Sequence, residues 1–189
     1  PDFVLPFMLS KEDAFQALKK HYLKKPLLPS TFSKANLLQE IKGVYSPFWM
    51  YDGEASGSVE FHATTVHKYT SGDYEVTEIS HYDVRRAGSI SFEKIPVDAS
   101  SKMPDDYMDS IEPFNYADLK PFSTAYLPGF LADKYDVSVE DSRERADKRC
   151  AGSMVSALER TDSGYTSCNE TRRDIHLKRG KVHSALLPV

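Results

Sequence analysis

The residues with the clearest capacity for chemistry are two histidines and two carboxylates in a predicted β-hairpin. The candidate metal ligands are His62, His81, Glu60 and Asp83. A turn at Ser71–Gly72 would place the two histidines directly opposite each other, with one carboxylate two residues along on each strand of the same face. Imidazole and carboxylate are suitable ligands for zinc or iron, so the set could support metal-dependent hydrolysis. The alternative, which the pattern favours, is a solvated polar face of the hairpin.

A second candidate site is basic. Arg85 and Arg86 adjoin the same hairpin, and they would form an anion-binding site if they met Lys178 and Arg179 in space. No residue is expected to be catalytic, because the chain has no G-x-S-x-G nucleophile motif. Cys150 lies on the apolar stripe of a predicted helix, which is typical of a thiol in a protein core.

Composition and missing motifs narrow the function classes further. In 189 residues, 24 lysines and arginines stand against 28 aspartates and glutamates, which gives a net charge of −4. Nucleic-acid binding depends on clustered positive charge, so we expect none from this chain. No GxxxxGK[ST] loop is present to hold a nucleoside triphosphate, which excludes helicase activity in this region. No apolar run approaches about 20 residues, so no membrane insertion is expected.

Two principal helices are predicted from their first turns. Ser10 with Asp13, and Ser138 with Asp141, have the spacing of a capping box, in which the serine and the acid satisfy free backbone N–H groups. The first helix is expected to end at Pro26 because proline cannot continue the hydrogen-bonding pattern.

The positions between and after these helices alternate as β-strands do. Strands are predicted at 41–51, 59–69, 74–84, 90–97, 171–177 and 182–189. Gly53 and Gly57 are expected to form a turn or bend between the first two strands, and Arg179–Gly180 joins the last two. The proline-rich stretch 98–128 is predicted to be an ordered connector whose aromatic residues pack onto the sheet. It contains one helical turn at 105–110, and a further helix is expected at 127–135.

These elements predict an α+β fold in which an antiparallel β meander is combined with the two principal helices. A faint repeat of helix starts and strand motifs suggests two similar halves. The predicted organisation is a helix and meander at 1–98, the connector at 99–136, and a second helix with β segments at 137–189, all of which could form one compact domain. Both ends of the chain are abrupt, so we expect it to be a piece of a longer protein.

Several segments together resemble one bacterial family. They are 41–52, Arg85–Ser89, Asp109–Phe114 and Ala125–Asp136. They are similar to an uncharacterised family common in Firmicutes that has an N-terminal zinc ribbon of the transcription-factor-IIB type and is often labelled a helicase or primosomal protein N-prime. The resemblance covers nearly the whole chain and implies that this region follows the ribbon. It implies no catalytic residues, and this chain lacks the cysteine pairs of the ribbon.

The resulting hypothesis is a cytoplasmic, non-enzymatic interaction or scaffold domain that accompanies a zinc ribbon. No cofactor is expected in this chain, whereas zinc is expected in the longer protein, some relatives of which look membrane-associated. The partner is expected to be a protein, bound at an open edge of the final strand. Two alternatives stay open: a metal-dependent hydrolase at His62 and His81, and nucleic-acid binding by the longer protein through its ribbon.

Overall fold

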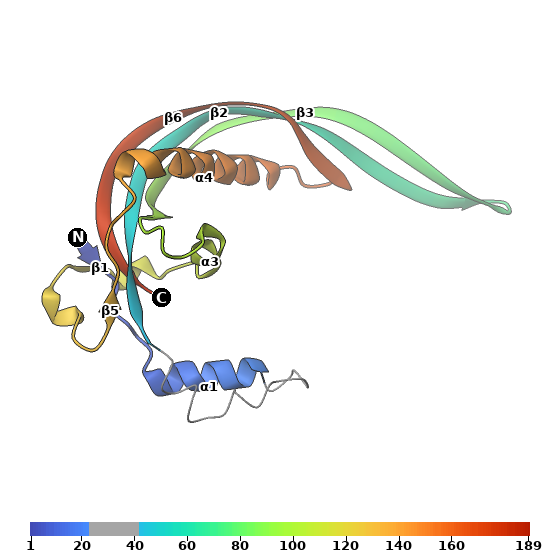
Figure 1. Cartoon of the computed structure of the whole chain (residues 1–189). Helices are drawn as coiled ribbons and strands as arrows, with labels where there is room; N and C mark the ends of the chain where they lie inside the picture. The colour runs from blue at the N-terminus through green and yellow to red at the C-terminus, as the bar shows by residue number, and fades with distance from the viewer. Residues whose placement is uncertain (23–41) are drawn as a thin grey trace. The chain divides into compact units, whose positions relative to one another are not determined.

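The computed structural model describes residues 1–22 and 42–189 (Figure 1). The described strands are β1 (Phe3–Val4), β2 (Val44–Ser71), β3 (Tyr74–Asp98), β4 (Lys120–Pro121), β5 (Leu131–Ala132) and β6 (Ser167–Pro188). The described helices are α1 (Lys11–Tyr22), α3 (Asp105–Ser110) and α4 (Val139–Glu159), with short 3-10 turns at Tyr116–Asp118 and Thr124–Tyr126. A mixed, mostly antiparallel sheet with these helices is an α+β fold, which confirms the predicted class and the two principal helices.

The described strands form one sheet in the order β3-β2-β6-β1-β4, with β5 alongside β2. Two short pairings in it are parallel, β1 with β6 and β2 with β5, while β1 and β4 are antiparallel. Strands β2 and β6 run in opposite directions, since Val44 and Val189 exchange backbone hydrogen bonds of 3.1 and 2.8 Å at one end. The final strand therefore lies between β1 and β2 at Ala185–Leu186, and the prediction that its end forms an open edge is wrong.

The predicted breaks inside the strands are absent, because β2, β3 and β6 are each continuous. Gly57 marks a close approach of two backbones instead of a turn. A Cβ atom there would lie 2.0 Å from the carbonyl oxygen of Asp174 on β6, and its φ of +152° disfavours other residues. At Gly180 a Cβ would lie 2.9 Å from the carbonyl oxygen of Asp52. These glycines let β2 and β6 stay in contact where a side chain would separate them.

The turn of the β2–β3 hairpin lies one residue later than predicted. Strand β2 ends at Ser71 and β3 begins at Tyr74, so the turn residues are Gly72 and Asp73 instead of Ser71 and Gly72. Gly72 has a φ of +63°, which a two-residue hairpin turn requires at its first position and which glycine adopts without steric cost. The correction moves each cross-strand partner by two residues, so the same side chains still share each face.

The contacts divide the chain into two compact units. The first comprises Pro1–Met50, Val97–Ser142 and His183–Val189, and the second comprises Tyr51–Pro96 and Arg143–Val182. Neither unit is one continuous stretch of the chain. Strands β2, β3 and β6 and helix α4 each have residues in both units.

The first unit contains the proline-rich connector, whose aromatic side chains pack as expected except for the exposed Tyr107. Phe114 meets Phe48 edge to face with ring centroids 5.8 Å apart, and Met108 of α3 is buried in the same cluster. The single helical turn at Asp105–Ser110 is confirmed. The helix expected at 127–135 is wrong, since β5 lies there and the Leu131 N–H donates to Gly43 instead of to a helical turn.

The serine side chains cap both helices at the predicted positions. Ser10 Oγ accepts from the Asp13 N–H at 3.1 Å and donates to the Asp13 carboxylate at 2.7 Å. The Asp13 carboxylate also accepts the Ser10 N–H at 3.2 Å, which completes the box. Ser138 and Asp141 make the two Oγ bonds at 3.1 and 2.7 Å, which are the serine half of the box. The predicted end of the first helix at Pro26 lies outside the described residues.

In the second unit, α4 covers one face of the three long strands. Alternate residues of β2, among them Val59, Phe61 and Ala63, are buried with Val155 of α4. The predicted apolar stripe of the helix makes these contacts, with Cys150 and Met154 in a neighbouring cluster. The intervening residues of β2 point to the opposite face of the sheet, which we call the polar face.

Candidate functional site

The polar face carries the two histidines predicted from the sequence. His62 lies between the inward-facing residues Phe61 and Ala63 of β2, so its ring is directed away from α4. The Nε2 atom of His62 is 3.2 Å from the Nδ1 atom of His81 on β3, and the two rings stack at 26°. The structure brings the two imidazoles together, but the prediction that they are directly opposite each other is wrong, because the later turn puts Asp83 across from His62 and leaves His81 diagonal to it.

Asp83 completes this group from β3. Its carboxylate is 3.2 Å from Nδ1 of His62. A carboxylate can only accept here, so His62 donates from Nδ1, and in the neutral ring Nε2 is then the acceptor that faces His81. The His62 side chain is 44% exposed and that of Asp83 is 97% exposed, so the group is open to solvent.

Glu60, the fourth predicted ligand, belongs to a different part of the polar face. It lines a cavity of about 220 Å³ with Ser58 of β2, Arg85 of β3, and Arg172 and Asp174 of β6. Arg85 donates to Ser58 Oγ at 3.1 Å. Among residues 1–22 and 42–189, the structure contains no group of three or more histidine, cysteine or acidic side chains arranged to hold a metal ion.

The arginines of the predicted anion-binding site do not meet, because each one contacts a different partner. Arg86 is paired with the Asp162 carboxylate at 2.5 Å, and the Asp162 side chain is fully buried. Arg179 is paired with Asp147 at 2.6 Å. Adjacent residues of a strand point to opposite faces, which explains why Arg85 and Arg86 do not act together. The sequence pattern did not indicate either of these two ion pairs.

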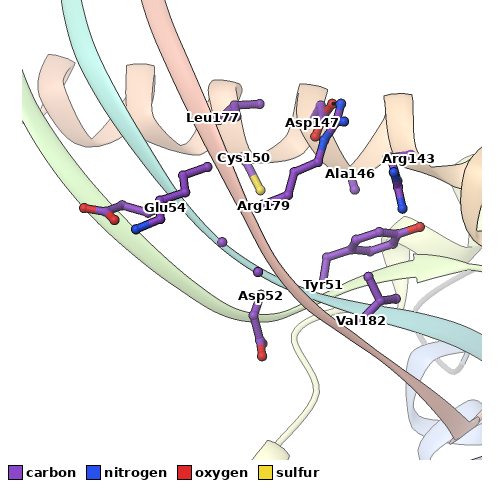
Figure 2. Close-up of a pocket in the computed structure, with 13 residues that line it drawn as sticks. Tyr51, Asp52, Glu54, Arg143, Ala146, Asp147, Cys150, Leu177, Arg179 and Val182 are labelled. Atoms are coloured by element: carbon purple, nitrogen blue, oxygen red, sulfur yellow. Dashed lines mark hydrogen bonds and ion pairs between the residues drawn. The ribbon is translucent and has the colours of Figure 1, made fainter.

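A second cavity, of about 100 Å³, lies between α4 and the strands of the second unit (Figure 2). Its lining comes from Tyr51–Glu54 of β2, from Leu177–Gly180 and Val182 of β6, and from Arg143, Ala146, Asp147 and Cys150 of α4. Two of its acidic side chains make hydrogen bonds or ion pairs with other residues of the protein. Asp147 holds Arg179, and the Asp52 carboxylate accepts the Lys94 N–H at 2.9 Å.

The cysteine in this cavity is poorly suited to nucleophilic chemistry. Burial raises the pKa of the Cys150 thiol, and the negative charge of Asp147 raises it further. The thiolate is the reactive form, so the thiol is largely protonated near neutral pH. The same Asp147 carboxylate raises the pKa of Arg179 by accepting its hydrogen bond. Two polar side chains of this cavity, Asp147 and Arg179, are therefore paired with each other, and the half-buried Cys150 packs beside the core as predicted.

The fold and these sites define an α+β protein whose second unit presents a polar strand face. Over all 189 residues the chain is 42% identical to the uncharacterized protein YdjG of Bacillus subtilis (strain 168). The chain spans 55% of that protein, or about half of its length. No family model matches the chain, and no solved structure matches it.

No helix within the described residues is long and apolar enough to cross a membrane.

Proposed function

We propose that this chain is a non-enzymatic interaction region that binds another protein and accompanies a zinc ribbon in a longer cytoplasmic protein. The observation that carries the proposal is the outer part of the β2–β3 hairpin, residues 65–80, which we call the arm. In Figure 1 the hairpin continues beyond the ends of α4 and β6. Strand β6 begins beside Thr64, whose carbonyl oxygen accepts the Thr166 N–H, so the arm is two-stranded.

Apolar side chains are exposed along the arm. From Val66 to Ile79 every residue is exposed except Val76, which is half-buried. Tyr74 is 77% exposed and Ile79 is 52% exposed, and Val66 and Tyr69 are also exposed. Large exposed apolar and tyrosine side chains are typical of surfaces that bind other proteins. An isolated two-stranded hairpin is marginally stable in water, so a bound partner would stabilise the arm.

The edges of the arm suggest how a partner would bind. In the part of the chain that the structure describes, β3 has a neighbouring strand on one side only. Unpaired backbone N–H and C=O groups on such an edge can pair with an extended segment of another protein. We therefore infer that the partner adds a β-strand to the arm, with the exposed tyrosine and isoleucine side chains providing the apolar contacts.

The zinc ribbon rests on the family resemblance described above. YdjG is longer than this chain, which leaves room in the relative for a further segment. A ribbon would supply zinc binding to the longer protein, and nucleic-acid binding through the ribbon is the alternative function. Steeply salt-dependent binding of DNA by the longer protein, retained after the arm is altered, would favour that alternative.

The test uses a photo-crosslinking amino acid in place of Tyr74 on the arm. The matched control replaces Tyr107 of α3, which is 67% exposed and lies in the first unit. We expect irradiation of cells that express the full protein to give a discrete protein adduct from position 74 alone. The further change Ile79→Asp should abolish that adduct while leaving the unfolding transition unchanged. Equal adducts from both positions, or none from the arm, would refute the proposed interface.

A further inference from the structure

The paired imidazoles of the polar face hold two ring nitrogens at the separation expected for two ligands of one metal ion. The ring nitrogens that face each other, Nε2 of His62 and Nδ1 of His81, are 3.2 Å apart. Two nitrogens bound to one tetrahedral zinc ion at about 2.0–2.1 Å lie roughly 3.3 Å apart. The backbone positions of β2 and β3 therefore already hold the two nitrogens at close to the required separation.

We propose that His62 and His81 bind a single borderline divalent transition-metal ion of the zinc class. Imidazole nitrogen favours Zn²⁺, Ni²⁺ and Cu²⁺, whereas Mg²⁺ and Ca²⁺ prefer oxygen ligands. The two histidines occupy two positions of the ion, and water fills the others. This proposal concerns a site in this chain and is independent of the ribbon and of the arm's partner.

Asp83 has the position of a supporting residue in this site. Its carboxylate lies 3.2 Å from Nδ1 of His62, the nitrogen that does not face His81. A metal-bound histidine commonly donates its other N–H to a carboxylate, which fixes the tautomer and orients the ring. Asp83 thus favours the tautomer of His62 in which Nε2 is available to bind the ion.

The metal-free pair predicts a specific exchange of tautomers. His62 accepts at Nε2, so His81 donates from Nδ1 in the absence of metal. When the ion binds, His81 coordinates through Nδ1 and carries its proton on Nε2 instead. The proton of the neutral His81 ring moves between its two nitrogens by exchange with water.

Glu60 is not part of the proposed ligand set. It lines the cavity formed with Arg85 and Arg172, whose positive charges attract its carboxylate. The proposed site therefore has two protein ligands and open positions, unlike a closed structural zinc site with four. We expect weaker binding than at a structural zinc site, because fewer protein ligands hold the ion.

The test is a titration of the EDTA-treated 189-residue chain with Zn²⁺, followed by calorimetry, with Mg²⁺ as the metal control. We expect saturable binding of one Zn²⁺ per chain and none of Mg²⁺. The variants His62→Gln and His81→Gln should each weaken Zn²⁺ binding at least tenfold. The matched control is His67→Gln, since His67 is an exposed histidine of the same hairpin and, five residues from His62, alternates to the opposite face. This control should bind Zn²⁺ as the unaltered chain does.

Two further measurements separate metal ligation from a merely structural role. Nitrogen NMR should show Zn²⁺ shifting Nε2 of His62 and Nδ1 of His81, with the proton of His81 moving to Nε2. Asp83→Asn should weaken Zn²⁺ binding about tenfold while leaving one ion per chain. The proposal is overturned if Zn²⁺ does not bind saturably, or if both histidine variants bind it as the His67→Gln control does.

Discussion

Replacement of Gly57 by alanine should be among the most destabilising single changes in the second unit. The added Cβ would lie 2.0 Å from the carbonyl oxygen of Asp174 and 2.9 Å from the Cα of Ile175. Both atoms belong to the backbone of β6, so no side-chain rotation can relieve the contact. The φ of +152° at Gly57 adds strain for any residue that has a Cβ.

The expected cost follows from these two effects. A carbon–oxygen contact normally lies at about 3.3 Å or more, so β2 and β6 must separate locally by roughly 1.3 Å. Such a shift disrupts about two ladder hydrogen bonds at about 1 kcal/mol each. The strained backbone adds about 1–3 kcal/mol. We therefore expect Gly57→Ala to lower the free energy of unfolding by about 4 kcal/mol.

Two matched glycines separate steric contact from backbone strain. A Cβ at Gly72 meets no atom within 4 Å, but its φ of +63° should cost alanine about 1 kcal/mol. Gly152 in α4 also has open space and has no positive φ, so Gly152→Ala should stabilise by about 1 kcal/mol through helix propensity. The expected order of stability is Gly152→Ala, then the unaltered chain, then Gly72→Ala, then Gly57→Ala.

Urea unfolding followed by far-ultraviolet circular dichroism measures these differences. Trp49, the one tryptophan of the chain, belongs to the first unit, so its fluorescence reports on a different part of the protein. If Gly57→Ala costs no more than Gly72→Ala, the close approach of β2 and β6 is refuted as the reason for glycine at this position.

Three other outcomes are expected from the described contacts. Arg86→Ala should destabilise by about 2 kcal/mol because it leaves the buried Asp162 carboxylate unpaired. The same change at the exposed neighbour Arg85 should cost under about 0.5 kcal/mol in urea unfolding, and equal costs would contradict the ion-pair argument. Ser138→Ala should cost about 1 kcal/mol through loss of the α4 cap, and an unchanged urea midpoint would contradict it. Because the pKa of Cys150 is raised, its alkylation should be slower than that of a free thiol between pH 7 and about 8.5. The alkylation rate should increase at higher pH. A rate equal to that of free cysteine at neutral pH would refute this expectation.

Local features of the fold were predictable from short stretches of sequence. A capping box depends on residues three apart, and both Ser10 with Asp13 and Ser138 with Asp141 make its serine hydrogen bonds. The helical turn at Asp105–Ser110 follows Pro104 and begins with two acids, a pattern that is typical of a helix start. These predictions are correct because the hydrogen bonds and charge interactions that stabilise a helix start are made between neighbouring residues and do not depend on the rest of the fold.

Glycines misled the prediction because their role depends on distant partners. In the sequence, Gly57 and Gly180 indicate turns, since glycine has no intrinsic preference for a strand. In the structure they lie within strands, facing the backbones of Asp174 and Asp52. Which role a glycine takes is decided by the strand that approaches it, and that strand is more than a hundred residues away in the chain.

The candidate site also has features that the sequence predicted and features that depend on distant parts of the chain. Alternation along two strands was enough to place His62 and His81 on one face, because a shift of the turn by one residue moves cross-strand partners by two and preserves the faces. The sequence by itself therefore determined the α+β class, the helix starts and the shared face of the two imidazoles. Only the tertiary structure decided that Glu60 lines a cavity with Arg85 and Arg172 instead of joining the imidazoles, and that Arg86 pairs with the buried Asp162. Those choices depend on β6 and on the segment after α4, whose positions are set by packing across the sheet and not by neighbouring residues.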